Sequence, residues 1–147
     1  MLGHPDFEKL AESQWPLVAR LHDLGSLAPL AAALTSAGEI EGLALAGEEH
    51  SGLGPDQALL VLRDKLRARA KAGEIAAALL IYHGVDRGEG AVMPARTASE
   101  ANAVVMVLDH RDGTSTISVV GYAKGLGAGW RYDAPRSTPT RSIVFAS

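Results

Sequence analysis

A chain of 147 residues has the size of a single folded domain, and its balance of 47% hydrophobic and 21% charged residues argues against disorder. The absence of cysteine excludes disulfide bonds, thiolate zinc sites and a cysteine nucleophile. The net charge of −3 does not favour nucleic-acid binding, and no apolar run approaches the roughly 20 residues of a membrane-spanning helix. We therefore expect one soluble domain over residues 1–147, located in the cytoplasm and without nucleic-acid or membrane partners. The composition suggests a bacterial protein.

The first half of the chain, about residues 1–73, is predicted to be helical. Asp6 is a suitable N-cap for a short first helix. Pro16 interrupts the helical pattern, and proline is tolerated in the first turn, so a second helix is predicted to begin near Ser13. Gly25 is a natural stop for that helix.

The segment from Ser26 to Gly38 is predicted to be a third helix, because its leucines recur at helical spacing. Residues 39–47 fit neither a helical nor a strand period. The sequence Ala37–Ile40 recurs as Ala72–Ile75, each time before an apolar run. This similarity suggests the alternative that Ile40 to Ala46 is a short strand.

The clearest helix is predicted from Pro55 to Gly73, with proline in its first turn and glycine after its end. Its apolar stripe consists of Leu59, Leu62, Leu66 and Ala70. Beside that stripe lies a basic one formed by Arg63, Arg67 and Lys71. The basic stripe predicts contact with an acidic partner or a phosphate, and the alternative is an ordinary solvated helix face.

The second half, about residues 74–147, is predicted to form a sheet. Residues 74–82 lack polar alternation, which is typical of a buried strand. Residues 85–102 are predicted to form a long loop, and residues 130–133 and 141–145 are candidate final strands. The predicted fold is of the α+β class, with N-terminal helices packed on a four- to five-stranded, mostly antiparallel sheet.

A β-hairpin is predicted from Ala103 to Tyr122, with Asp112 and Gly113 as a two-residue turn. The pleat directs Asp109 and His110 to opposite faces of the first strand. The register that this turn imposes predicts a core face formed by Val104, Met106, Leu108, Ile117 and Val119.

Histidines near carboxylates are the candidate catalytic residues. His83 follows the buried strand, and Asp86 could orient it as a general base. Together with Tyr82, and with His110 if its strand is a neighbour, these side chains are predicted to line one cavity. The alternatives are a loop histidine for His83 and a solvated hairpin end for His110. No local spacing predicts a metal site, and the glycine run at residues 125–129 does not precede a helix, so no cofactor is predicted.

Two functions are compatible with these features. The first is a non-enzymatic binding or interaction protein, accessory or regulatory, that contacts a protein partner. The alternative is a small-ligand binder or enzyme with a cone-like α+β fold and a cavity lined by His, Asp and Tyr. A homo-oligomer is also predicted through Arg141 to Phe145, because an apolar edge strand is costly to leave open.

Overall fold

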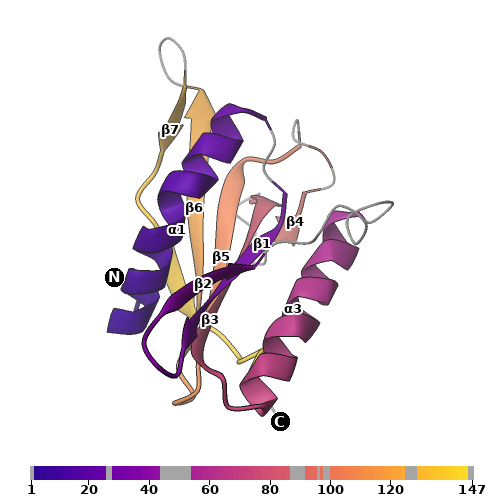
Figure 1. The fold of residues 1–147 in the computed structure, drawn as a ribbon. Coiled ribbons are helices and arrows are strands. Elements are labelled where there is room, and N and C mark those ends of the chain that lie inside the picture. Colours follow the sequence, from indigo (N-terminus) through magenta and orange to yellow (C-terminus); the bar gives the residue numbers. More distant parts are fainter. Residues whose placement is uncertain are drawn as a thin grey trace.

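The computed structural model describes residues 2–25, 28–43, 54–86, 92–95, 97, 100–124 and 129–145. In this part of the chain two helices, α1 (Pro5–Asp23) and α3 (Pro55–Lys71), enclose a large curled sheet between them (Figure 1). The strands are β1 (Leu30–Thr35), β2 (Ile40–Leu43), β3 (Ile75–Val85), β4 (Met93–Pro94), β5 (Ala103–His110), β6 (Ser115–Lys124), β7 (Trp130–Tyr132) and β8 (Arg136–Pro139).

The strands of the sheet lie in the order β2-β1-β3-β5-β6-β7. Every pairing is antiparallel; β4 extends the sheet beside the end of β3, and β8 pairs with β6. The predicted α+β class is confirmed. The sheet is larger than predicted, since two of its eight strands lie in the half of the chain expected to be helical.

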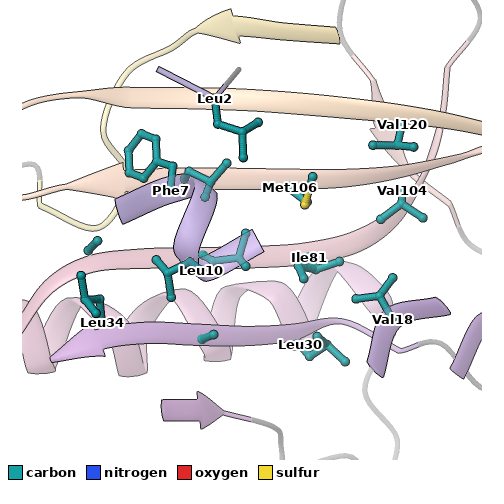
Figure 2. Packing of buried hydrophobic residues seen from close by; sticks show 14 residues of the cluster. Leu2, Phe7, Leu10, Val18, Leu30, Leu34, Ile81, Val104, Met106 and Val120 are labelled. Atoms are coloured by element: carbon teal, nitrogen blue, oxygen red, sulfur yellow. The ribbon is translucent and has the colours of Figure 1, made fainter. Parts of the chain in front are cut away.

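Helix α1 covers one face of the sheet. Its apolar residues Phe7, Leu10 and Val18 are fully buried against side chains from four strands. Figure 2 shows this core from close by. The labelled sheet residues are Leu30, Leu34, Ile81, Val104, Met106 and Val120.

Helix α3 covers the opposite face and confirms the predicted helix at Pro55 to Gly73. Leu62 and Leu66, at the centre of the predicted stripe, are fully buried. Ala58 is buried beside them, so the stripe is rotated slightly from the predicted one. Because both faces of the central strands are covered, these strands carry apolar residues without alternation.

The predicted break in the first helix is wrong. Helix α1 runs through Pro16, and the ring of His4, not Asp6, caps it by accepting a hydrogen bond from the Asp6 N–H group. A proline inside a helix costs about 3 kcal/mol because it removes one backbone hydrogen bond. Burial of Phe7 before the proline and Val18 after it, each stabilising by roughly 1.5–3 kcal/mol, offsets that cost.

The predicted helix from Ser26 to Gly38 is also wrong, because residues 30–35 form β1. Alanine favours helices, but here Ala31, Ala32 and Ala33 are almost completely buried between the two helices. Their small side chains let both helices approach the sheet, so packing overrides propensity. Strand β2 agrees with the alternative of a strand from Ile40, although residues 44–46 lie outside the described residues.

The predicted hairpin is confirmed, but its register is wrong by one residue. Gly113, at φ 97°, closes a three-residue loop in which the His110 N–H group donates to the Thr114 carbonyl. Val105 therefore pairs with Val119, on the face that α3 covers. The shift moves Ile117 and Val119 away from α1 and places Val120 beneath it. Since both faces are buried, the apolar pattern could not select between the two registers.

The C-terminal segment is not the predicted strand at residues 141–145; the last strand is β8, at residues 136–139. The buried Asp109 carboxylate holds this segment by accepting hydrogen bonds from the Ile143 and Val144 N–H groups, both at 2.7 Å. Arg67 donates to the Ile143 carbonyl from α3. These contacts dock Val144 on the α3 side of the core.

The remaining expectations concern the loops. Residues 85–102, predicted to be a long loop, contain the short strand β4 at residues 93–94. Residues 87–91, 96, 98 and 99 lie outside the described part, as do residues 125–128 of the glycine run. The strand predicted at residues 130–133 is confirmed as β7.

Candidate functional site

The structure separates the residues that were predicted to share a cavity. His83 and His110 lie on the face that α1 covers, whereas Tyr82 points to the opposite face. His83 pairs with Val104 and His110 with Ala77, so six residues of strand, roughly 20 Å, separate the two histidines. Their proposed roles in catalysis or binding remain predictions.

Asp86 is not paired with His83. Its carboxylate forms an ion pair with Arg136 of β8. The Asn102 side chain bonds the backbone N–H and C=O groups of Asp86, each at 2.8 Å. Asp86 thus ties the end of β3 to β8 instead of orienting an imidazole.

The basic stripe on α3 is partly engaged within the chain. Arg67 donates to the carbonyl of Ile143, and Arg63 contacts the neighbouring Asp64 at 3.1 Å. Lys71 is exposed at the end of the helix. The intramolecular contact of Arg67 weakens the predicted role of this stripe in binding an acidic partner.

His83 instead belongs to a group that we call the aromatic–histidine cluster, formed by His22, His83, Tyr122, Trp130 and Tyr132. The ring of His22 stacks on Trp130 with centroids 4.2 Å apart and planes inclined by 14°. The rings of Tyr122 and His83 lie edge to face with the His22 ring, with their centroids 4.2 and 5.2 Å from its centroid. The cluster lies where the ends of α1, β3 and β6 meet β7.

Hydrogen bonds within the cluster join each imidazole to a phenol. His22 Nδ1 lies 2.7 Å from the Tyr132 hydroxyl, and His83 Nδ1 lies 3.2 Å from the Tyr122 hydroxyl. His83 Nε2 is buried without a hydrogen-bond partner among the described residues. A buried polar atom in that state destabilises the fold.

Burial sets the charge state of the cluster. It lowers the pKa of His83 to about 4, with a smaller contribution from His22, and it also lowers the pKa of His22. Burial raises the pKa of Tyr122 to about 12 and raises that of Tyr132 as well. At neutral pH the cluster therefore carries no charge.

Next to this cluster, a pocket of about 330 Å³ lies between α1 and the sheet. Buried Leu2, Met106 and Val120 contribute to its floor. Trp15 and Tyr132 form an aromatic wall, edge to face with centroids 5.0 Å apart. Because the Tyr132 hydroxyl is bonded to His22, the aromatic–histidine cluster fixes the orientation of this wall.

The pocket is acidic. Its lining includes the carboxylates of Glu8, Glu12 and Asp133 and no basic residue among those described. The Glu8 carboxylate accepts a hydrogen bond of 2.6 Å from the Leu2 N–H group, whereas Glu12 and Asp133 are exposed. This charge distribution favours a cation over an anion.

Sequence reasoning did not identify this pocket, although one signal was available. Glu8, Glu12 and Trp15 recur at i, i+4 and i+7, which places them on one side of a continuous helix. The predicted break at Pro16 obscured that periodicity. Tyr132 lies more than a hundred residues further along the chain, so only the fold brings it to Trp15.

A second group lies at the other end of the same face, at the start of α1 and the β5–β6 turn. In this imidazole–carboxylate cluster, formed by His4, Asp6, His110 and Asp112, the two rings stack with centroids 4.0 Å apart. His110 Nε2 lies 2.8 Å from the Asp6 carboxylate, and His4 Nε2 lies 3.1 Å from that of Asp112. A hydrogen bond from the Thr114 backbone lowers the pKa of Asp112 to about 2.

None of the helices in the described part of the chain has the length and apolar character needed to cross a bilayer. Comparison of the chain with models of known protein families, with curated proteins and with solved structures found no match.

Proposed function

We propose that this protein binds a small amphipathic cation in the pocket between α1 and the sheet. One observation carries the proposal: an apolar floor, an aromatic wall and three carboxylates line the same 330 Å³ space. That volume lies within the usual range for small-molecule sites. The function is binding without a reaction. It is of the same class as the ligand-binding alternative predicted from the sequence, but the pocket is a different one and contains neither Tyr82, His83 nor Asp86.

The two parts of the pocket recognise two parts of the ligand. The apolar residues of the lining, among them Ala11, Met106 and Val120, accept an apolar group of the ligand. Trp15 and Tyr132 present aromatic rings, which attract an ammonium or guanidinium group. The exposed carboxylates of Glu12 and Asp133 add electrostatic attraction at the rim.

The competing function, docking of an acidic partner on α3, has less support. Arg67, at the centre of the basic stripe, donates to the Ile143 carbonyl and is not free to contact a partner without releasing the C-terminal segment. Oligomerisation remains a prediction, but residues 141–145 no longer supply the edge strand on which it depended.

The experiment is a titration with three probes of similar shape that differ in charge: phenethylammonium, phenethyl alcohol and phenylacetate. Amide NMR shifts of Val120 and Tyr132 report on the pocket. We expect weak binding in the order ammonium, alcohol, acetate. Equal or tighter binding of phenylacetate, or shifts confined to other parts of the molecule, would contradict the proposal.

Two variants and a control locate the site. Glu12→Gln removes one carboxylate and is expected to weaken phenethylammonium binding by about two- to fivefold. Trp15→Leu removes the cation–π contribution and is expected to weaken it further. Glu39→Gln, in the β1–β2 turn outside the pocket, makes the same change of charge and should leave the affinity unchanged.

A further inference from the structure

We propose that the imidazole–carboxylate cluster is a binding site for a divalent transition-metal ion, with His4, His110 and Asp112 as ligands and zinc as the ion that the donor set suits best. In the part of the chain that the structure describes, these three residues place one donor atom each within 4.8 Å of one another. Two imidazoles and one carboxylate form a zinc ligand set that leaves a fourth position for water.

The Asp112 carboxylate approaches both rings, each through a different oxygen. Its Oδ2 lies 3.1 Å from His4 Nε2 and its Oδ1 lies 3.4 Å from His110 Nδ1, so small rotations bring one oxygen and both nitrogens around an ion. Zinc–ligand bonds of about 2.0–2.1 Å place neighbouring tetrahedral ligands roughly 3.3 Å apart. The two rings must open from their stacked contact so that both nitrogens face the ion.

Asp6 supplies the second layer of the site. His110 Nε2 lies 2.8 Å from the Asp6 carboxylate, so this nitrogen donates its proton to Asp6 and Nδ1 keeps a lone pair. A carboxylate on the other ring nitrogen is the usual device for orienting a metal-bound histidine. The lone pair of His110 Nδ1 points towards the turn that carries Asp112, since it accepts a hydrogen bond from the Asp112 N–H group.

Binding replaces two hydrogen bonds from the backbone. The Asp112 N–H group gives up His110 Nδ1 to the ion. In the structure, His4 Nδ1 accepts a hydrogen bond from the Asp6 N–H group. When His4 coordinates the ion through Nε2, its proton moves to Nδ1 and this hydrogen bond is lost. The Asp6 carboxylate lies 3.9 Å from His4 Nδ1 and must move closer to accept that proton in a hydrogen bond. Asp112 is nearly half exposed, so both the ion and water can reach the site.

The test uses the full chain without a histidine tag. Zinc titration by calorimetry is expected to give one site per chain with micromolar affinity, and cobalt is expected to give the visible absorption of a tetrahedral complex. His110→Gln and Asp112→Asn should each lower the zinc affinity at least tenfold. Asp6→Asn, which changes only the second layer, should lower it about tenfold.

Controls separate loss of ligands from loss of structure. Asp112→Asn keeps an oxygen that can accept the Thr114 N–H hydrogen bond, so its turn should remain folded by circular dichroism. His83→Gln removes a histidine from the aromatic–histidine cluster and should leave zinc affinity unchanged. Absence of saturable zinc binding, or binding that persists in both ligand variants, would overturn the proposal.

Discussion

Two pairs of histidines lie at opposite ends of the sheet face that α1 covers, and their surroundings differ in almost every respect. His22 and His83 are packed among aromatic rings, and burial lowers the pKa of both. His4 and His110 stack on each other with a carboxylate beside each ring. Histidine therefore packs as a neutral ring at one end and pairs with carboxylates at the other.

The difference follows from what covers each end of the sheet. At the first end β7 folds back beside β6, and its rings exclude water from His22. At the second end α1 begins and β5 turns into β6. The backbone N–H groups of Asp6 and Asp112 are not bonded within a helix or strand there, and they donate hydrogen bonds to imidazole nitrogens of His4 and His110. The helix N-terminus also favours the Asp6 carboxylate electrostatically.

The largest effect is expected from His22→Ala, at the aromatic end. The substitution removes the ring stacked on Trp130 and leaves the Tyr132 hydroxyl without its partner. We expect the free energy of unfolding to fall by about 2–4 kcal/mol in urea denaturation. Leu17→Ala, at an exposed position of the same helix, should change it by no more than about 0.5 kcal/mol. Similar losses in the two variants would show that the cluster is not tightly packed.

An intermediate effect is expected from acid, again at the aromatic end. The pKa of His83 is about 4 in the folded protein, below its usual 6.5, so the unfolded chain takes up this proton first as the pH falls. The stabilisation is complete above pH 6.5 and is lost as the pH falls towards 4. Allowing for partial exposure, we expect a loss of about 1–2 kcal/mol from this group.

Urea denaturation at pH 7 and pH 4.5 measures that loss, with His83→Phe as the reference. The phenylalanine variant keeps a ring at this position and cannot take up a proton. The unfolding free energy of the variant should therefore depend less on pH than that of the wild type. Identical pH dependence in the two proteins would mean that His83 is protonated in the folded state.

The smallest effect is expected at the other end, from His4→Ala. The substitution removes the imidazole that accepts the Asp6 N–H hydrogen bond at the start of α1. Loss of an N-cap costs about 1 kcal/mol, measurable by thermal or urea unfolding. His4→Asn, which restores a good capping side chain, should recover that stability without restoring metal affinity. Failure of asparagine to recover stability would show that the contact of His4 with His110 matters more than its cap.

Several elements could be predicted from local sequence because local chemistry determines them. Pro55 in a first turn and Gly73 after the last one bound α3, and the unbroken apolar run from Ile75 identifies β3 as buried. The Asp-Gly pair located the β5–β6 turn. It did not determine the register, because glycine at a positive φ suits both a two- and a three-residue loop.

Only a part of the candidate sites could be predicted. His83 was identified as a residue at a strand end, but its neighbours were not, since His22 and Tyr122 come from α1 and β6. The imidazole–carboxylate cluster joins residues 4 and 6 to residues 110 and 112, and no local sequence spacing predicts a contact between residues so far apart in the chain.

Local sequence patterns were enough to predict the α+β class, the helix at Pro55, the buried strand at Ile75 and the existence of the hairpin. Packing in the folded chain selects a strand for the alanines of β1, the continuation of α1 through Pro16 and the face that each residue of β6 occupies. These three outcomes have one cause. Each choice is nearly balanced in local free energy, and burial between two helices and a sheet supplies the difference.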